Sequence, residues 1–335
     1  MSKFKVVLIE KNQRIEPVYE ADELGDLDVE LISVAVDSEG DVIEAIAGAD
    51  VVLNSSLPMP KSVIDTLDNC KIIVRLGHGY EGVDLDATTD AGIIVCNAAG
   101  ATSEEVSNHA LSLMLFLARR LYELNPGTRA GKWGELWSRE ACSQIWDETV
   151  GVFGFGHIGR AFARKANALR MNVIVHDPYV GHWADLEDNV SMVEFDKLIE
   201  SSDFISIHAP FKEETHNKFN ADVFRRMKAS AFLINTGRGG IVSEADLVQA
   251  LRNEEIAGAA IDVFETEPQG DNNPLFDFNN VIVTPHVAGS SPGGWERIRR
   301  SAARDAARAL TGRRPYCVVN TDVLSSGTRA DILPA

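Results

Sequence analysis

The sequence has few cysteines, and none lies in a pattern typical of a secreted or metal-binding protein. The 335 residues include only four: Cys70, Cys96, Cys142 and Cys317. They are far apart, form no CxxC pair and have no histidine at metal-ligand spacing, so we expect neither a disulfide framework nor a metal site. Such a chain is expected in the reducing cytoplasm.

Long hydrophobic runs are also absent. The longest, ALSLMLFLA at 110–118, is far below the roughly 20 residues that a membrane-spanning helix needs. The apolar run within the N-terminal MSKFKVVLIEKN is short for the core of a signal peptide and fits a first strand better. We therefore expect neither a membrane partner nor secretion.

Positive charge is scarce, because 32 Lys and Arg stand against 50 Asp and Glu, a formal net charge of -18. The field around such a chain repels phosphate backbones and anionic lipids, so nucleic acid is not an expected partner. The balance of 45% apolar and 24% charged residues is typical of a soluble globular protein. The length is comfortable for two domains.

Short apolar runs alternate with helical patterns along the chain, which is typical of parallel sheets covered by helices on both faces. A first series of strands is expected at 5–10, 29–35, 50–54, 71–77 and 92–98, and a second at 149–154, 172–177, 203–209, 231–236, 257–263 and 280–285. The fold class is therefore α/β with two doubly wound parallel-sheet domains. We expect one domain at 1–101 and 290–335 and the other at 102–289.

Two further helices are expected outside these series. One, at 103–121, has a middle that is apolar nearly all round, so it should be buried on more than one side. We expect it to cover its own domain and to meet its copy in a homodimer. The other, at 293–310, follows the second series and could carry the chain back to the first domain.

A glycine-rich turn follows the expected strand at 149–154. Gly154, Gly156 and Gly159 have the GxGxxG spacing, open a helix and precede a strand that ends at Asp177. Helix N-terminal amides can hold a pyrophosphate, and a carboxylate there can accept the ribose hydroxyls, so a dinucleotide is expected. Asp177, with no Arg or Lys in the following PYVGHWADLED, favours NAD over NADP. The alternative is a tight turn without a ligand.

Chemically useful side chains follow three later strands. Arg238 lies in LINTGRGGIV, Asp262 and Glu267 in AIDVFETEP, and His286 in VIVTPHVAG. Ligands of open α/β sheets bind at the carboxyl ends of the strands, where a guanidinium, carboxylates and an imidazole could bind an acid and move a proton. Each residue alone could instead be structural. The same applies to His208 after its strand and to His109 in the apolar helix, which we expect to be packed or at an interface.

Taken together, these motifs resemble one family. VFGFGHIGR, HDPY, INTGRGGIV, AIDVFETEP and VTPHVAG, in this order and spacing, are similar to the D-isomer-specific 2-hydroxyacid dehydrogenases. KIIVRLGHGYEGVDLDA and VCNAAGATSEEVSNHAL resemble the branch around C-terminal-binding-protein-like and phosphoglycerate-dehydrogenase-like members. The resemblance covers roughly residues 45 to 320. It implies a Rossmann NAD-binding domain at 102–289 and a flavodoxin-like substrate domain.

The resemblance also implies roles for individual residues. Arg238 would bind and polarise the 2-keto acid, His286 would be the general acid/base, and Glu267 would pair with the histidine. The backbone around Gly77, His78 and Gly79 would receive the substrate carboxylate. The residues expected beside NAD are Gly154, Phe155, Gly156, His157, Ile158, Gly159, Asp177, His208, Ala209, Pro210, Thr215, Thr236, Gly237, Asp262 and Gly289.

The implied function is NAD-dependent interconversion of a 2-keto acid and a D-2-hydroxy acid. His78 and Glu81 stand where family members often carry a small or apolar residue and an Asn, so the identity of the acid is not implied. Formate dehydrogenases share the architecture but carry Gln beside the histidine, so Glu267 argues against that activity. An NAD-sensing, corepressor-like binding protein is the other alternative, although VAGSSPGGW lacks the pocket-closing aromatic of the corepressors.

Overall fold

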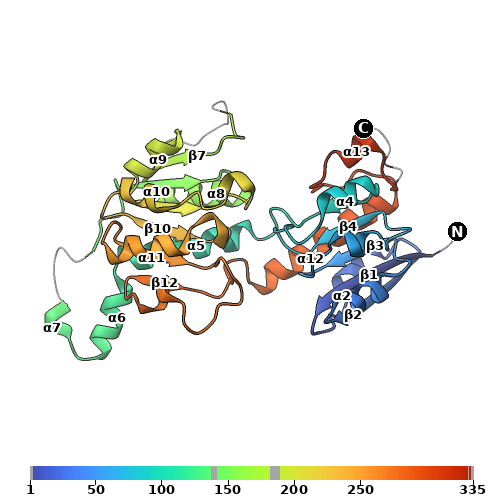
Figure 1. The fold of residues 1–335 in the computed structure, drawn as a ribbon, viewed down its shortest axis with the longest axis horizontal. Coiled ribbons are helices and arrows are strands. Elements are labelled where there is room, and N and C mark those ends of the chain that lie inside the picture. The colour runs from blue at the N-terminus through green and yellow to red at the C-terminus, as the bar shows by residue number, and fades with distance from the viewer. Residues whose placement is uncertain (1–2, 137–141, 182–188, 331, 333–335) are drawn as a thin grey trace. The chain divides into compact units, whose positions relative to one another are not determined.

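The chain folds into two α/β units (Figure 1). The structure is a computed structural model that describes residues 3–136, 142–181, 189–330 and 332. Unit 1 comprises Met1–Thr102 and Ser291–Ala335, and unit 2 comprises Ser103–Ser290. Unit 1 is therefore built from two separate stretches of sequence, whereas unit 2 is continuous.

Unit 1 contains a five-stranded parallel sheet in the order β2-β1-β3-β4-β5, which is the flavodoxin-like order. Its strands are β1 (Phe4–Lys11), β2 (Val29–Val36), β3 (Val51–Asn54), β4 (Ile72–Arg75) and β5 (Ile94–Cys96). The inner strands β3 and β4 and the edge strand β5 are Val- and Ile-rich and almost fully buried, as a sheet covered on two sides requires. Each fully buried Val, Leu or Ile contributes about 1.5–3 kcal/mol.

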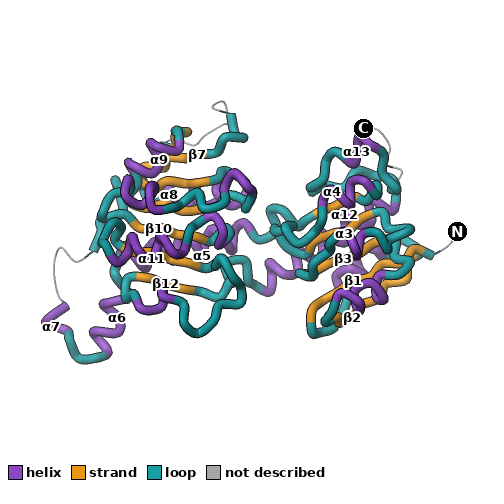
Figure 2. Tube along the Cα trace, viewed as in Figure 1, coloured by secondary structure: helices purple, strands orange, loops and turns teal. Residues whose placement is uncertain are grey.

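Helices cover both faces of this sheet (Figure 2). They are α1 (Val18–Leu24), α2 (Glu39–Ile46), α3 (Lys61–Ile64), α4 (Leu85–Asp90), α12 (Pro292–Leu310) and α13 (Val323–Ser326). The long α12 packs an alanine-rich stripe against β3 and β4. It also carries the buried Arg299, whose guanidinium pairs with both carboxylate oxygens of Glu20 in α1 at 2.7 and 2.5 Å. This ion pair joins the two stretches of unit 1.

Unit 2 contains a seven-stranded parallel sheet in the order β12-β11-β10-β9-β6-β7-β8, a Rossmann order. Its strands are β6 (Thr149–Phe153), β7 (Asn172–His176), β8 (Val190–Met192), β9 (Phe204–Ile207), β10 (Phe232–Asn235), β11 (Gly258–Ile261) and β12 (Val281–Val283). The α/β class with two parallel sheets is confirmed, and so are all eleven predicted strands. The edge strand β8 was not predicted, because its sequence VSM places a serine between two apolar residues and forms no continuous apolar run.

Two apolar clusters cover the two faces of this second sheet. The helices of unit 2 are α5 (Ser103–Ala118), α6 (Leu121–Arg129), α7 (Trp133–Leu136), α8 (His157–Ala168), α9 (Phe195–Ser201), α10 (Ala221–Arg226) and α11 (Glu244–Arg252). Short 3₁₀ turns lie at Glu213–Thr215, Gly239–Ile241 and Pro274–Asp277. Within the described chain, α6 and α7 bury none of their residues, and Figure 1 shows them projecting from the rest of unit 2.

The predicted apolar helix is α5, and it packs on α8, β10 and β11. It ends at Ala118 rather than near 121, because Arg120 has φ 49° and breaks the helix before α6. One side, including Ala110, Met114 and Leu117, is fully buried. On the opposite side Asn108 and Ser112 are exposed, while Leu111, Leu115 and Phe116 are half-buried.

No helix of the described residues is both long and apolar enough to span a membrane. Among the same residues, no group of three or more His, Cys, Asp or Glu side chains is arranged to hold a metal ion. All four cysteines are described, and all four are thiols without a disulfide partner.

Candidate active site

The glycine-rich turn joins β6 to α8 at the carboxyl edge of the second sheet. Gly154 has φ +93°, and a Cβ built there would lie 2.5 Å from the backbone nitrogen of Ala209. At Gly159 a Cβ would lie 2.1 Å from the carbonyl oxygen of Gly154. A Cβ at Gly156 would meet no described atom within 4 Å. Two glycines are thus required by the fold, and the third leaves open space at the N-terminus of α8, where an anion can bind.

Asp177 follows β7 and faces this turn. Its Oδ2 accepts the Phe155 backbone N–H at 2.7 Å, and its Oδ1 accepts the N–H of Tyr179 at 2.9 Å. Each carboxylate oxygen can accept a further hydrogen bond, so the side chain is fixed in place and still able to bind a hydroxyl. A cavity of about 280 Å³ lies beside it. The lining residues are Phe153, Gly154, His176, Asp177, Pro178, Tyr179, Ala209, Pro210, Glu214, Thr215 and Lys218.

Two further polar groups lie at the ends of the neighbouring strands β9 and β10. His208 Nε2 is 2.9 Å from Ser206 Oγ, and burial of the ring lowers the pKa of His208 to about 3, so the imidazole is neutral. Among the described residues, neither His208 Nδ1 nor the buried Thr236 Oγ1 has a hydrogen-bond partner. Buried polar atoms normally have partners, so these two fit a site that binds a polar ligand.

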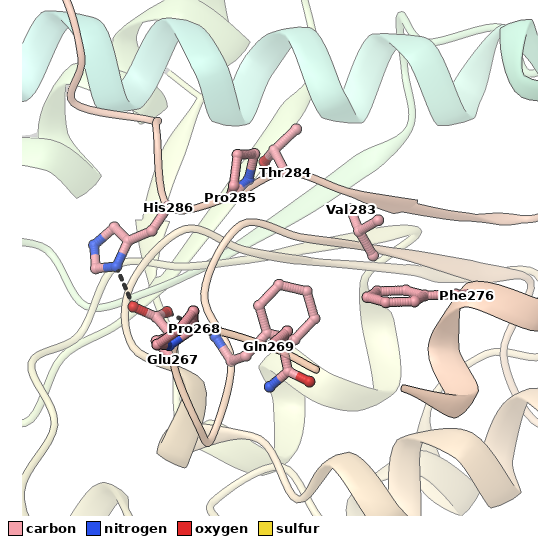
Figure 3. A pocket seen from close by; sticks show the side chains of 9 residues that line it. Glu267, Pro268, Gln269, Phe276, Val283, Thr284, Pro285 and His286 are labelled. Atoms are coloured by element: carbon pink, nitrogen blue, oxygen red, sulfur yellow. Dashed lines mark hydrogen bonds and ion pairs between the residues drawn. The ribbon is translucent and has the colours of Figure 1, made fainter. Parts of the chain in front are cut away.

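His286 and Glu267 form a close pair after β12 and β11 (Figure 3). His286 Nδ1 lies 2.6 Å from Glu267 Oε2, and Glu267 Oε1 accepts the Phe264 N–H at 2.9 Å. The other ring nitrogen points away from Glu267 (Figure 3). Both side chains are partly exposed, 49% for His286 and 35% for Glu267, so a substrate can reach the imidazole. The carboxylate fixes the orientation of the ring.

The pair borders a cavity of about 590 Å³ that is mostly apolar. Figure 3 shows Phe276 and Val283 across this cavity from His286. Both are exposed, at 44% and 38%. The surroundings of the imidazole therefore combine one carboxylate with an apolar wall.

Asp262 lies under the His286 loop and is fully buried. Its carbonyl oxygen accepts the N–H of His286 at 2.8 Å, and its carboxylate accepts the N–H groups of Val287 and Ala288, both at 3.0 Å. Thr284 Oγ1 donates to the same carboxylate at 2.5 Å and is 3.1 Å from His109 Nε2. Because His286 has φ +52°, a conformation that costs about 1–3 kcal/mol, these bonds hold the catalytic candidate in a strained position.

Arg238 lies in the turn after β10. Its Nη1 donates to the Gly237 carbonyl oxygen at 2.7 Å, and the Asn235 side chain bonds both Gly237 N–H and Arg238 carbonyl oxygen at 3.0 Å. A Cβ at Gly239 would lie 1.9 Å from the Phe264 carbonyl carbon. The turn that carries Arg238 is therefore packed against the loop that carries Glu267.

The predicted carboxylate-binding loop lies in unit 1, after β4. Gly77 and His78 accept hydrogen bonds through their carbonyl oxygens, from the Ala98 N–H at 2.9 Å and from Asn97 Nδ2 at 2.7 Å. The Gly100 N–H donates to His78 Nε2 at 3.1 Å. The imidazole therefore holds the loop through Nε2 as an acceptor, which leaves its hydrogen on Nδ1.

Three groups at the carboxyl edge of the second sheet were not predicted: the Tyr179 hydroxyl, Lys212 and Glu214. The sequence suggested only the loop after β7 as a place for a phosphate-binding cation. In the strand order β9-β6-β7, however, the loop after β9 lies on the other side of the glycine turn, and it carries Lys212 and Glu214. The signal that could have found them is this strand order.

The chain is similar to known proteins of one family. Residues 111–288 match the model described as D-isomer specific 2-hydroxyacid dehydrogenase, NAD binding domain. The chain is similar to a D-3-phosphoglycerate dehydrogenase of Archaeoglobus fulgidus, with 37% identity over 262 residues, covering 78% of this chain and 49% of that protein. It thus spans about half the length of that relative.

A glyoxylate reductase of Thermofilum pendens is 35% identical over 267 residues, which is 78% of each chain. Among solved structures, a glyoxylate reductase from Paecilomyes thermophila has a TM-score of 0.85 at 25% identity and covers 95% of this chain and 99% of its own.

Proposed function

The chain belongs to the D-isomer-specific 2-hydroxyacid dehydrogenase family, and from this premise we propose that it is an NAD-dependent oxidoreductase that interconverts a 2-keto acid and a D-2-hydroxy acid. The observation that carries the proposal is the 2.6 Å contact between His286 Nδ1 and Glu267 Oε2. An imidazole oriented by a carboxylate, with its second nitrogen directed away from that carboxylate, is equipped to move a proton.

The residues at the glycine turn fit a dinucleotide. The pyrophosphate would bind at the N-terminus of α8, which Gly156 leaves open, and Asp177 would accept the ribose hydroxyls. His208 Nδ1 and Thr236 Oγ1, which lack partners within the described chain, would meet polar atoms of the cofactor. When the cofactor is bound, the hydride comes from its reduced nicotinamide.

The protein's own residues move the proton and hold the acid. In reduction, His286 donates its Nε2 hydrogen to the oxygen that becomes the hydroxyl, while Glu267 holds the ring in place through Nδ1. The planar fork of Arg238 binds the keto acid and stabilises the developing negative charge. For the substrate carboxylate we propose the loop of Gly77, His78 and Gly79, through its second and third N–H groups, because the Gly77 N–H donates to the Arg75 carbonyl oxygen at 2.9 Å.

The two alternatives receive less support. Formate dehydrogenases share the architecture but carry Gln beside the histidine. In this protein the Glu267 carboxylate contacts the ring instead. A purely NAD-sensing protein would need no oriented acid/base pair. The pair therefore favours turnover, and a binding role could exist beside it.

The test is NADH oxidation with glyoxylate, pyruvate and hydroxypyruvate, with His286→Gln as the matched control. At least one keto acid should be reduced by the native protein, and the variant should bind NADH but turn over far more slowly. NADH binding without reduction of any 2-keto acid would instead support the sensor function.

We further propose that the protein is a homodimer in the cytoplasm. The half-buried apolar side of α5, with Leu111, Leu115 and Phe116, suits contact with a second copy. The projecting α7 carries Trp133, which is 72% exposed and also suits an interface. The four thiols, two of them buried, fit a reducing compartment.

A further inference from the structure

The cavity beside Asp177 has a second carboxylate on its opposite side. Glu214, in the 3₁₀ turn after β9, lines the same cavity as Asp177. If the proposed function holds, this cavity receives the adenosine ribose, because it lies between the glycine turn and Asp177. A 2′-phosphate at this position would thus face two negative side chains rather than one.

Tyr179 and Glu214 join the two loops that border this cavity. The Tyr179 hydroxyl lies 2.6 Å from Oε1 and 2.8 Å from Oε2 of Glu214, so its single hydrogen is shared between the two carboxylate oxygens. We call this contact the Tyr179–Glu214 clasp. The hydrogen bond to Glu214 is the main cause of a raised pKa of Tyr179, and the Asp177 charge adds to it. The phenol therefore remains a donor, and the Glu214 charge is fixed in place.

A lysine stands behind the clasp. Lys212 Nζ is 3.8 Å from Glu214 Oε1 and 4.6 Å from the centroid of the Tyr179 ring. Tyr179 and Glu214 line both the ribose cavity and an open groove of about 490 Å³, whereas Lys212, of the described residues, lines only the groove. The Tyr179–Glu214 clasp therefore separates Lys212 from the cavity, and Glu214 pairs with a cation that could otherwise bind a 2′-phosphate.

A second lysine lines the cavity itself. Lys218 Nζ lies 4.3 Å from the centroid of the Phe195 ring, which directs this ammonium toward an aromatic face. Any gain in phosphate binding could come from either lysine, so the test must separate them.

We infer that Glu214, fixed by Tyr179 and paired with Lys212, is a specificity-determining residue that excludes a 2′-phosphate and so makes the site selective for NAD. The inference rests on the proposed function. If Asp177 were the only carboxylate here, the flexible side chain of Lys212 would have no anionic partner and could turn toward a 2′-phosphate on the ribose. With Glu214 in place, the lysine has a carboxylate partner, and the 2′-phosphate meets like charge on both sides.

The experiment measures binding without turnover, by competition of 5′-AMP and 2′,5′-ADP against the fluorescence of bound NADH. Glu214→Gln keeps an acceptor for the Tyr179 hydroxyl but removes the charge. This variant should bind 2′,5′-ADP about five- to tenfold more tightly, because a 2′-phosphate carries nearly two negative charges. Its affinity for 5′-AMP should change less than about twofold. Glu213→Gln is the matched control, since it removes the same charge one residue away without touching Tyr179.

Two double variants identify the cation. Adding Lys212→Gln to Glu214→Gln should return 2′,5′-ADP to its native affinity, whereas adding Lys218→Gln should leave the gain in place. Unchanged 2′,5′-ADP affinity in Glu214→Gln, an equal gain in Glu213→Gln, or a gain that depends on Lys218 would overturn the inference. If the native protein binds neither NADH nor 5′-AMP, the proposed function is wrong. If it binds both, the results with the variants test the role of Glu214 alone.

Discussion

Replacing Asp262 by Asn should separate the positioning of His286 from its chemistry. The substitution keeps the shape of the side chain, so it changes only charge and hydrogen bonding. In the native protein Asp262 Oδ1 accepts hydrogen bonds from the Thr284 hydroxyl and the Val287 N–H, and Oδ2 accepts one from the buried N–H of Ala288. An amide oxygen can replace the first, but the amide nitrogen would then face the Ala288 N–H, donor against donor.

The loss in the free energy of unfolding can be estimated from these contacts. A buried N–H left without an acceptor costs about 1–3 kcal/mol, and two bonds that lose a charged acceptor weaken by about 1 kcal/mol each. The sum is roughly 3–5 kcal/mol, which for a unit of this size lowers Tm by about 10 °C. The His286 backbone, no longer fixed at φ +52°, should lose its alignment, and kcat should fall about 10- to 100-fold.

Calorimetry and steady-state reduction of the best keto acid measure the two effects. Asp203→Asn is the matched control, because Asp203 also accepts a backbone N–H, from Thr149 at 2.9 Å, but precedes β9 at the opposite edge of the sheet. It should lower Tm and leave kcat within about twofold. An Asp262→Asn enzyme with native kcat would refute the reasoning, whatever its stability.

Four other predictions concern the roles proposed above. His286→Gln should lower kcat by roughly 10² to 10⁴ with NADH binding nearly intact, and undiminished turnover would reassign the acid/base. Glu267→Gln replaces the carboxylate that orients the His286 ring with an amide, so kcat should fall while NADH binding stays nearly intact; an unchanged kcat would contradict this. Arg238→Lys keeps the charge but loses the planar fork, so KM should rise and kcat fall together, whereas a change in KM alone would indicate simple binding. Light scattering should find two copies per particle at micromolar concentration, and a monomer there would exclude the proposed dimer.

Much of the fold could be predicted because parallel strands covered on both sides have a strong signal. Runs such as 72–74 and 232–234 are continuous in apolar residues, as burial on both faces requires. The edge strand Val190–Met192 has no such run, since an edge strand needs only partial burial. The break at Arg120 was also missed, because a positive φ at a residue other than glycine has no local sequence signal.

The site was predictable where each residue follows its own strand, as His286, Glu267 and Arg238 do. What could not be predicted are contacts made across the sheet edge. Asp262 was expected beside NAD, which remains a prediction; that its carboxylate also binds the backbone of the His286 loop depends on the register of β11 and β12. The Tyr179–Glu214 clasp joins residues 35 positions apart and depends on the strand order.

The two-part construction of unit 1 has a consequence for synthesis of the chain. All five strands of its sheet have been made by Cys96, but α12, which covers one face with Ile298, Ala302 and Ala306, begins only at Pro292. At translation rates of about 5–20 residues per second, that apolar face waits roughly 10–40 seconds for its cover. Unit 2 emerges and can fold during this interval, since it is continuous. A nascent chain is therefore most exposed to aggregation, and most in need of a chaperone, while the ribosome is making unit 2.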